Sequence, residues 1–274
     1  MEILRNRRGI AIAVRGKKRN SGKMRGAASF DTVIISDLHL GSRLSRAKDA
    51  VRMLRQQNFR RLILLGDIFC DLNFSRLKKD HWRFLSYIRK LSNPKRGVEV
   101  VWVEGNHDQG LSHLMSHLVG VRVYQEYFWE FGGQRLLAVH GHQFDRFVVN
   151  NELLSRLGAS AFLALQRLDS RSGSFSRFLD RLNSAWLRLT PKVATGALAY
   201  AKHHHVDCVF CGHTHQSLQA EQEGTRYYNA GCWTSSSATY ITVGEEGIEI
   251  HEYQSGTDDR DSGEERSRIA SPAA

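Results

Sequence analysis

Apolar runs and amphipathic stretches alternate along the central part of this chain. Short apolar runs that end quickly in polar residues are typical of buried strands, whereas apolar residues repeating every three or four positions are typical of helices with one buried face. Their alternation indicates a layered α/β domain in which helices cover sheets. The runs that predict strands cover residues 32–36, 61–65, 98–103, 135–139 and 206–211.

Two amphipathic stretches, residues 45–57 and 77–91, separate the first three of these runs and predict helices. Their apolar positions are Ala47, Ala50, Val51 and Leu54 in the first stretch, and Trp82, Leu85 and Ile88 in the second. Strand, helix and strand in succession indicate parallel neighbours. Further on, a short strand at 227–229 precedes residues 239–243 and 248–253, which flank a Gly-Glu-Glu-Gly turn and predict an antiparallel hairpin.

The stretch from about 146 to 205 lacks strand signals and predicts a helical insertion. Leu, Phe and Ala recur there at helical spacing, with arginines between them. Most of the apolar residues are expected to pack helix against helix. The arginines are either solvated or face an anionic substrate or lipid headgroups. They are Arg156, Arg167, Arg171, Arg177, Arg181 and Arg188.

The formal net charge of +11 is concentrated at the N-terminus. Residues 1–30 hold nine Lys/Arg and one Glu, whereas residues 255–274 hold five acids and three Arg, so the body is only mildly basic. We interpret 1–30 as a disordered basic arm, with attraction to anionic membranes or nucleic acid as the alternative, and 255–274 as a disordered tail. Residues 31–254 form the predicted domain, and no apolar run reaches the length of a membrane-spanning helix.

The four cysteines do not form the framework of a disulfide-stabilised protein, so a reducing cytoplasm is the expected compartment. Cys208 and Cys211 have C-x-x-C spacing but lie within the predicted strand 206–211. Residues three apart on a strand point to opposite faces and cannot readily chelate one ion. Small buried side chains are therefore favoured over a zinc or redox pair. Trp129 and Phe131 lie outside every motif and are interpreted as core or interface residues.

Residues that ligate metals directly follow five of the predicted strands. In α/β sheets, sites form where the carboxyl ends of strands meet, so five such ends can converge on one place. The segments are Ser36-Asp37-Leu38-His39, Gly66-Asp67, Gly105-Asn106-His107-Asp108, Val139-His140-Gly141-His142 and Cys211-Gly212-His213-Thr214-His215.

The residue types in these segments suit divalent ions. Mixed oxygen and imidazole ligands favour manganese, iron or zinc over calcium and magnesium. Two such ions, roughly 3.5–4 Å apart, can clamp the attacking and leaving oxygens of a displacement at phosphorus. A lone histidine would more often be structural, but five segments in this order predict two divalent ions, with Mn²⁺ first and Fe²⁺ or Zn²⁺ as alternatives.

This series of motifs (D-x-H, G-D, G-N-H-D, G-H and G-H-T-H) resembles the calcineurin-like metallophosphoesterase superfamily over roughly residues 31–254. The resemblance implies an α/β fold, a four-layer α/β/β/α sandwich of two facing sheets flanked by helices, with the insertion as a helical lid. It also implies two sets of metal ligands. One metal is held by Asp37, His39 and His215, the other by Asn106, His140 and His213, and Asp67 bridges them.

The same resemblance assigns His107 and Asp108 to catalysis. His107 is expected over the phosphate rather than on a metal, where it would neutralise the transition state or protonate the leaving oxygen. Asp108 would orient the His107 ring. The alternative for Asp108 is a carboxylate that caps the loop and has no catalytic part.

Three further features are similar to the branch that contains UDP-2,3-diacylglucosamine pyrophosphatases of lipid A synthesis: residues 140–145, the insertion, and residues 229–233. The implied reaction releases UMP and 2,3-diacylglucosamine 1-phosphate, with the protein peripheral on the inner face of the membrane. Well-characterised members of this branch carry arginine where this chain has His107. The implied substrate contacts are Asn106, His107, Asp145 and Arg146.

Two other functions are compatible with the same residues. The first is a phosphodiesterase or phosphatase acting on another small or lipid phosphoester. The second is a nuclease or nucleic-acid-binding protein, suggested by the basic arm. The chain lacks a known nucleic-acid motif, and pure binding would not need seven metal ligands, so a phosphorylated small molecule or lipid is the expected partner, with peripheral contact to an anionic membrane.

Overall fold

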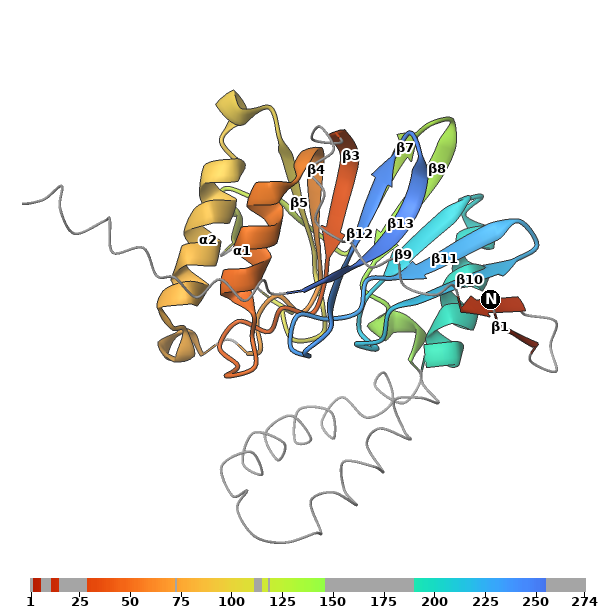
Figure 1. The fold of residues 1–274 in the computed structure, drawn as a ribbon, viewed down its shortest axis with the longest axis horizontal. Coiled ribbons are helices and arrows are strands. Elements are labelled where there is room, and N and C mark those ends of the chain that lie inside the picture. Colours follow the sequence, from red (N-terminus) through yellow and green to blue (C-terminus); the bar gives the residue numbers. More distant parts are fainter. Residues whose placement is uncertain are drawn as a thin grey trace, which may run out of the picture.

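The structure is a computed structural model that describes residues 2–5, 11–14, 29–71, 73–110, 115–117, 119–145 and 190–254. Its strands form two sheets that face each other (Figure 1). One sheet has the order β13-β12-β3-β4-β5-β6, with β3 (Ser29–Ile35), β4 (Asn58–Leu65), β5 (Glu99–Val103), β6 (Val123–Tyr124), β12 (Ala238–Gly244) and β13 (Gly247–Tyr253). The other has the order β1-β2-β10-β11-β9-β8-β7, with β1 (Glu2–Arg5), β2 (Ala11–Val14), β7 (Glu126–Phe131), β8 (Gln134–Val139), β9 (Cys208–Cys211), β10 (Leu218–Gln222) and β11 (Thr225–Asn229).

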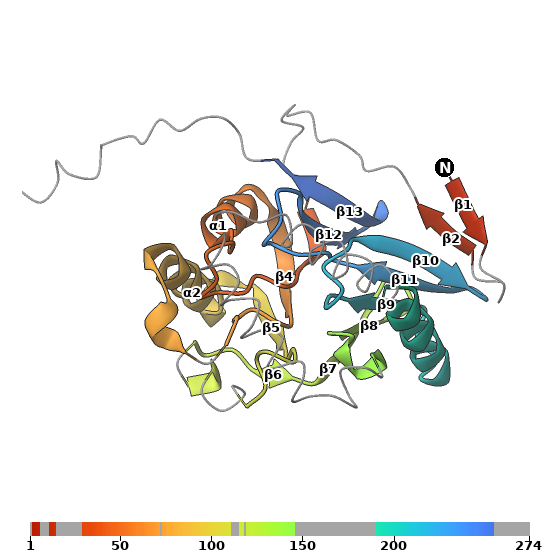
Figure 2. The same cartoon turned by 90° about the horizontal axis from the view of Figure 1, so that it is seen from below.

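The layers follow the order helix, sheet, sheet, helix, as expected for a four-layer sandwich (Figure 2). Helices α1 (Ala47–Gln56) and α2 (Lys79–Leu91) cover the outer face of the β3-containing sheet, and helical residues 190–203 cover the outer face of the other. The alternation of side chains along a strand produces this arrangement. Val33 and Ile35 of β3 pack under the helices, whereas Ile34 between them packs between the two sheets.

Strands β3, β4 and β5 pair in parallel and are buried on both faces near their carboxyl ends, which explains their continuous apolar sequence. Each connection between them runs through α1 or α2, so the predicted strand–helix–strand repeat is confirmed. The predicted hairpin is also confirmed, because β12 and β13 pair antiparallel.

The buried face of α1 is the predicted one, with Met53 added to it. The prediction for α2 is wrong at one position, since Trp82 is 51% exposed. The buried stripe of this helix consists of His81, Phe84, Leu85 and Ile88. These positions follow the spacing of one helical face, from which residue 82 is rotated by about 100°.

In the other sheet, β9 lies between β8 and β11 and pairs in parallel with both. Cys208 packs between the sheets and Cys211 under residues 190–203, so the two thiols point to opposite faces as predicted. Burial raises the pKa of Cys208 to about 11. Strands β7 and β10 were not predicted, and β7 places Trp129 in the core between the sheets, where its ring stacks on Phe210 with centroids 5.4 Å apart.

Two segments of the expected disordered arm are strands. Residues Glu2–Arg5 and Ala11–Val14 form an antiparallel pair, and β2 continues the sheet at the edge of β10, with Ala11 opposite Glu221. The pairing satisfies backbone groups that an open edge would expose. The rest of the arm, residues 146–189 of the insertion and the tail lie outside the described residues. Within the described part of the chain, no helix is long and apolar enough to cross a membrane.

Candidate metal centre

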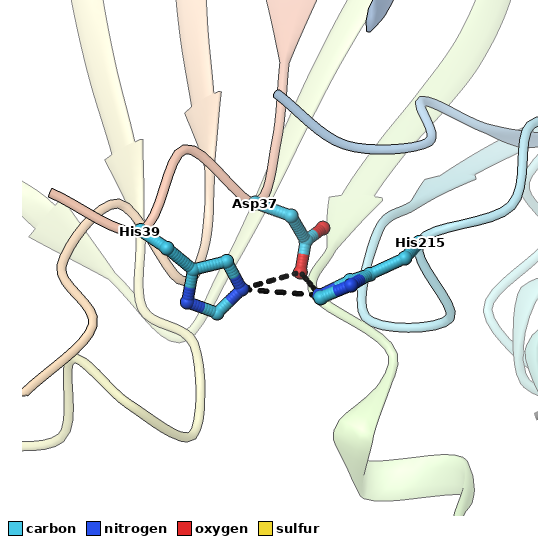
Figure 3. A group of neighbouring side chains, drawn as sticks. All are labelled: Asp37, His39 and His215. Atoms are coloured by element: carbon cyan, nitrogen blue, oxygen red, sulfur yellow. Dashed lines mark hydrogen bonds and ion pairs between the residues drawn. The ribbon is translucent and has the colours of Figure 1, made fainter. Parts of the chain in front are cut away.

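Asp37, His39 and His215 form a compact group of ligand atoms (Figure 3). The Nε2 atom of His215 lies 3.1 Å from Asp37 Oδ1, and Nε2 of His39 lies 3.7 Å from the same oxygen. The two Nε2 atoms are 3.0 Å apart. The three side chains come from the loops after β3 and β9, so they converge from both sheets on a single point.

Asp67, His140 and His213 form a second group, which is fully buried. The Nε2 atom of His140 lies 3.3 Å from Asp67 Oδ2, and the rings of His140 and His213 have centroids 5.4 Å apart. These residues follow β4, β8 and β9. The resemblance implies four side chains at the second metal when the bridging Asp67 is counted, and this group contains three of them.

Asp67 also belongs to a third group, with His39 and His107. The carboxylate of Asp67 therefore lies near ligands of both the first and the second group, as expected of a bridging ligand. The Nε2 atom of His107 lies 3.9 Å from Asp67 Oδ2. Asn106 is the neighbour of His107 in the loop after β5.

Buried polar atoms that lack a hydrogen bond indicate that these residues suit divalent ions. Asn106 Oδ1 is buried and accepts no hydrogen bond from the described residues. Asp37 Oδ1 and His140 Nε2 are likewise buried without a hydrogen bond, and their near neighbours are other ligand atoms. Leaving a buried acceptor unsatisfied costs about 1–3 kcal/mol, and carboxylate, amide and neutral imidazole acceptors cannot satisfy one another. A cation between them satisfies all of them together.

Hydrogen bonds to the outer atoms of the carboxylates turn the remaining oxygens toward the site. Asp37 Oδ2 accepts from Ser36 Oγ at 2.6 Å and from the backbone N–H of His213 at 2.9 Å. Asp67 Oδ1 accepts from the N–H of His107 at 2.8 Å. The other oxygen of each carboxylate is then directed at the imidazole nitrogens, as in metal sites whose outer contacts orient the ligands.

Charges in the buried site raise the pKa values of two histidines and lower those of two carboxyls. Burial lowers the pKa of His140 and of His215, but the negative charges of Asp67 and Asp37 outweigh it and raise both pKa values to about 9. Burial raises the pKa of each of these carboxyls, yet the neighbouring histidines hold both well below the usual range. His142, whose ring lies beside those of His140 and His213, has its pKa lowered to about 3 by burial and by these two histidines.

His107 and Asp108 differ in their burial and in their contacts. His107 is partly exposed, and its Nδ1 lies 2.8 Å from the carbonyl oxygen of Cys70, so that carbonyl orients the ring. Asp108 is fully buried and accepts hydrogen bonds from the N–H groups of Ile68 and Phe69 at 3.0 and 2.8 Å. The expectation that Asp108 orients the ring of His107 is therefore wrong, because both carboxylate oxygens hold the backbone of the loop after β4.

Two of the predicted substrate contacts remain, Asp145 and Arg146, and the structure describes only the first. Asp145 is buried, with Oδ2 at 3.6 Å from Nε2 of His213, so it lies against the second group. Arg146 lies outside the described residues, as do the residues from 147 to 189 that were expected to form most of the lid.

Five of the predicted ligands have left-handed backbones. Non-glycine residues rarely adopt a positive φ, and such conformations concentrate at functional sites. Two other non-glycine residues of the described chain share this conformation, His205 and Glu223. The five ligands are Asp37 (φ 52°), His39 (φ 48°), Asp67 (φ 50°), His213 (φ 66°) and His215 (φ 56°).

Asn229 has a structural role that was not predicted from the sequence. Its Nδ2 donates to the carbonyl of Gly212 at 2.7 Å and lies 3.2 Å from Thr214 Oγ1, and its Oδ1 accepts from the N–H of Gly231. It thus holds the loop that carries His213. In the sequence, Asn229 stands out as the last residue of a strand and the first of residues 229–233, but neither feature indicates this role.

One sequence family and several solved structures are similar to this chain. A sequence model of the calcineurin-like phosphoesterases matches residues 30–217. A search of curated proteins gives no significant match. Among solved structures, an archaeal phosphodiesterase is 15% identical, covers 81% of this chain and 99% of its own, and has a TM-score of 0.44.

Two further structures give similar values. Vacuolar protein sorting 29 from Cryptosporidium parvum is 13% identical, with 82% of this chain and 99% of that chain covered and a TM-score of 0.43. A hypothetical protein from Pyrococcus horikoshii is 12% identical, with 84% and 90% covered and a TM-score of 0.48.

Proposed function

Because this chain belongs to the calcineurin-like phosphoesterase family, we propose that it hydrolyses phosphoester or pyrophosphate bonds with two divalent ions. The observation that carries the proposal is the position of Asp67, whose carboxylate lies within 4.8 Å of ligand atoms of His140 and His213 and also, in a separate group, of His39 and His107. Bound at these two groups, the ions would activate water and stabilise charge on the phosphoryl oxygens.

The first ion would be held by Asp37, His39 and His215. The second would be held by Asn106, His140 and His213, with Asp67 shared between the two. The donor set of imidazoles, carboxylates and one amide oxygen favours manganese, iron or zinc, and Mn²⁺ is the ion we propose.

His107 is the group of this chain that we expect to act on the substrate. Its Nδ1 lies within hydrogen-bonding distance of the Cys70 carbonyl, which leaves Nε2 facing the site, 3.9 Å from Asp67 Oδ2. From there Nε2 can donate a hydrogen bond to a phosphoryl oxygen or a proton to the leaving oxygen. Asp108 supports this step indirectly by holding the loop after β4.

Purified protein with Mn²⁺ and bis-p-nitrophenyl phosphate tests the reaction class. Asp67→Asn should lower turnover by more than about 100-fold, beyond the usual effect of removing an outer-shell partner of a ligand. Asp207→Asn is the control, because Asp207 is exposed at the opposite end of β9. Undiminished turnover in Asp67→Asn would contradict the two-metal mechanism.

The substrate we propose is UDP-2,3-diacylglucosamine, cleaved to UMP and 2,3-diacylglucosamine 1-phosphate by a cytoplasmic protein in peripheral contact with the membrane. Its support is the likeness in sequence of residues 140–145, the insertion from about 146 to 205 and residues 229–233 to that branch of the family. Release of UMP from this lipid by the Mn²⁺-loaded protein is the expected result. Turnover of bis-p-nitrophenyl phosphate or cyclic nucleotides with the lipid left intact would favour a phosphodiesterase of another substrate.

A further inference from the structure

His81 is a polar residue in the buried stripe of α2. The other residues of that stripe, Phe84, Leu85 and Ile88, are apolar, whereas His81 is 3% exposed and carries a polar ring. A buried polar side chain is expected to have hydrogen-bond partners. Those of His81 lie in the backbone, and one of them belongs to the loop that carries His39.

The Nδ1 atom of His81 accepts two hydrogen bonds. They come from the N–H of Lys78, just before the helix, and from the N–H of Gly41, each at 3.1 Å. Because a backbone N–H can only donate, Nδ1 carries no proton, and the ring is neutral with its proton on Nε2. Burial and the nearby charge of Lys78 lower the pKa of His81, which favours that neutral form. The first bond closes the start of α2, and the second crosses to the loop after β3.

The backbone turns sharply directly after His39. The N–H of Ser42 donates to the carbonyl of His39 at 3.0 Å, and Gly41, the third residue of the turn, has φ 101°. Glycine adopts this conformation without strain, and turns with a positive φ at the third residue favour it. His39 itself has φ 48°, which is strained for a residue with a side chain and persists only where the surroundings hold it.

The peptide between Leu40 and Gly41, at the centre of this turn, is hydrogen-bonded on both sides. The carbonyl of Leu40 accepts from the N–H of Cys70 at 2.9 Å, and the N–H of Gly41 donates to His81. The central peptide of a turn can face either of two ways, which is the difference between type I and type II turns. Because both of its polar groups are bonded, this peptide is held in one orientation.

Loss of the acceptor on His81 would release one side of that peptide. Among the described residues, the N–H of Gly41 has no other acceptor. The backbone of His39 would then be held from outside the turn by the bond from its N–H to the carbonyl of Asp67 at 3.0 Å. A change in the turn would therefore move the ring of His39 relative to Asp67 and His215, which are carried by other loops.

We propose that His81 positions His39 for the first ion by holding the peptide between Leu40 and Gly41 in place. The inference rests on the proposed two-metal function and adds to it a residue of α2 that lies outside every sequence motif. His81 acts through Gly41 and is not itself a ligand.

Titration of metal-free protein with Co²⁺ tests this positioning, because the visible absorption of Co²⁺ responds to ligand geometry independently of turnover. Wild type should bind two Co²⁺. His81→Leu keeps a bulky side chain without an acceptor, and it should weaken one site by about 10–100-fold and alter its absorption. Asp80→Ala is the control, because it removes an exposed ion pair with Arg83 from the first turn of α2 and should match wild type.

His81→Asn tests the acceptor itself. The Oδ1 atom of asparagine is as many bonds from Cα as Nδ1 of histidine, so it can accept from the N–H of Gly41, and binding close to wild type is expected. His81→Gln, whose oxygen lies one bond farther out, should bind as weakly as His81→Leu. Near-ultraviolet circular dichroism verifies that each metal-free variant is folded, and His81→Gln replaces His81→Leu if the latter is not.

A double variant identifies the affected site. His39→Gln removes a ligand of the first ion and leaves the second site. Adding His81→Leu should not change the affinity of that remaining site, because both substitutions act on the same ion. A general loosening of the fold would instead weaken the second site as well.

Three results would overturn the proposal: unchanged Co²⁺ binding in His81→Leu or its replacement, equally weak binding in folded His81→Asn, or a weakened second site in the double variant. Each of them leaves the two-metal function intact. Fewer than two Co²⁺ bound to wild type would contradict the proposed function, and the inference with it.

Discussion

The Nδ1 atom of His140, in the loop after β8, lies 3.0 Å from the carbonyl oxygen of Leu65, the last residue of β4 in the facing sheet. This contact keeps a proton on Nδ1 and turns Nε2 toward Asp67. It also ties together the two sheets at the point where the ligands converge. Gly66, which follows Leu65, lies directly against the ring.

Gly66→Ala is expected to disrupt this contact. A Cβ atom there would lie 2.2 Å from His140 Nδ1, and the residue has φ +75°, so the substitution adds a steric clash to backbone strain. Overpacking of this kind costs about 1–3 kcal/mol. Gly97→Ala is the matched control, since Gly97 has φ +66° but no atom within 4 Å of the added Cβ. Thermal unfolding should show a larger loss for Gly66→Ala, together with weaker Mn²⁺ binding, and equal losses would contradict the role of the clash.

His107→Gln should separate catalysis from metal binding. The side chain of His107 faces the site through Nε2 but is not assigned to either ion, so two Mn²⁺ should still bind. Removing an acid or base group of this kind typically lowers turnover by about 10²–10⁴-fold. Comparing kcat for bis-p-nitrophenyl phosphate with the Mn²⁺ content of the same sample gives the result. Loss of one Mn²⁺ would instead make His107 a ligand.

Asn229→Ala is predicted to loosen the loop that carries His213. The substitution leaves the carbonyl of Gly212 and the N–H of Gly231 without their side-chain partner in a buried position. The Gly212 carbonyl keeps the N–H of Thr214 at 2.7 Å, so the N–H of Gly231 is the group left unsatisfied, at a cost of about 1–3 kcal/mol. A loss of outer contacts weakens metal binding by about 10–100-fold. Gln219→Ala removes a long amide hydrogen bond to Tyr228 from a partly exposed position and is the control. Calorimetric titration with Mn²⁺ should show the loss only for Asn229→Ala.

Stability of the metal-free protein should be greatest near pH 6.5. Because the pKa values of His140 and His215 rise to about 9 in the folded state, their contribution is complete below about 6.5 and is lost as the pH rises toward 9. Burial lowers the pKa values of His39, His142 and His213, so these residues are neutral when folded and destabilise the fold as the pH falls below about 6.5.

Melting temperatures in the presence of a chelator at about pH 5, 6.5 and 9 provide the measurement. With excess Mn²⁺ the decrease toward pH 9 should disappear, because metal ligands bind in their deprotonated form. A steady rise in melting temperature from pH 6.5 to 9 without metal would show that these two histidines are not charged in the folded protein.

Apart from β13, which was predicted with its hairpin turn, the strands predicted from the sequence are those whose residues are mostly buried. β4 is recognisable because Leu62 and Leu64 face the helices while Ile63 and Leu65 face the other sheet. β10 was missed because it mixes polar with apolar residues, and β7 because Glu126 and Glu130 on one face leave only a three-residue apolar run between them. A short strand with one solvent-exposed face has a hydrophobic periodicity that is too weak to identify it from the sequence.

By itself, the sequence determined the layered α/β architecture and indicated the candidate ligands, since both depend on local patterns: apolar runs, and Asp, Asn or His directly after them. Tertiary structure alone decided how those ligands are oriented. The carbonyls of Leu65 and Cys70 direct the rings of His140 and His107, and backbone N–H groups hold Asp108. Backbone groups are the same in every non-proline residue, so the contacts they make between residues far apart in the chain cannot be predicted from the residue types.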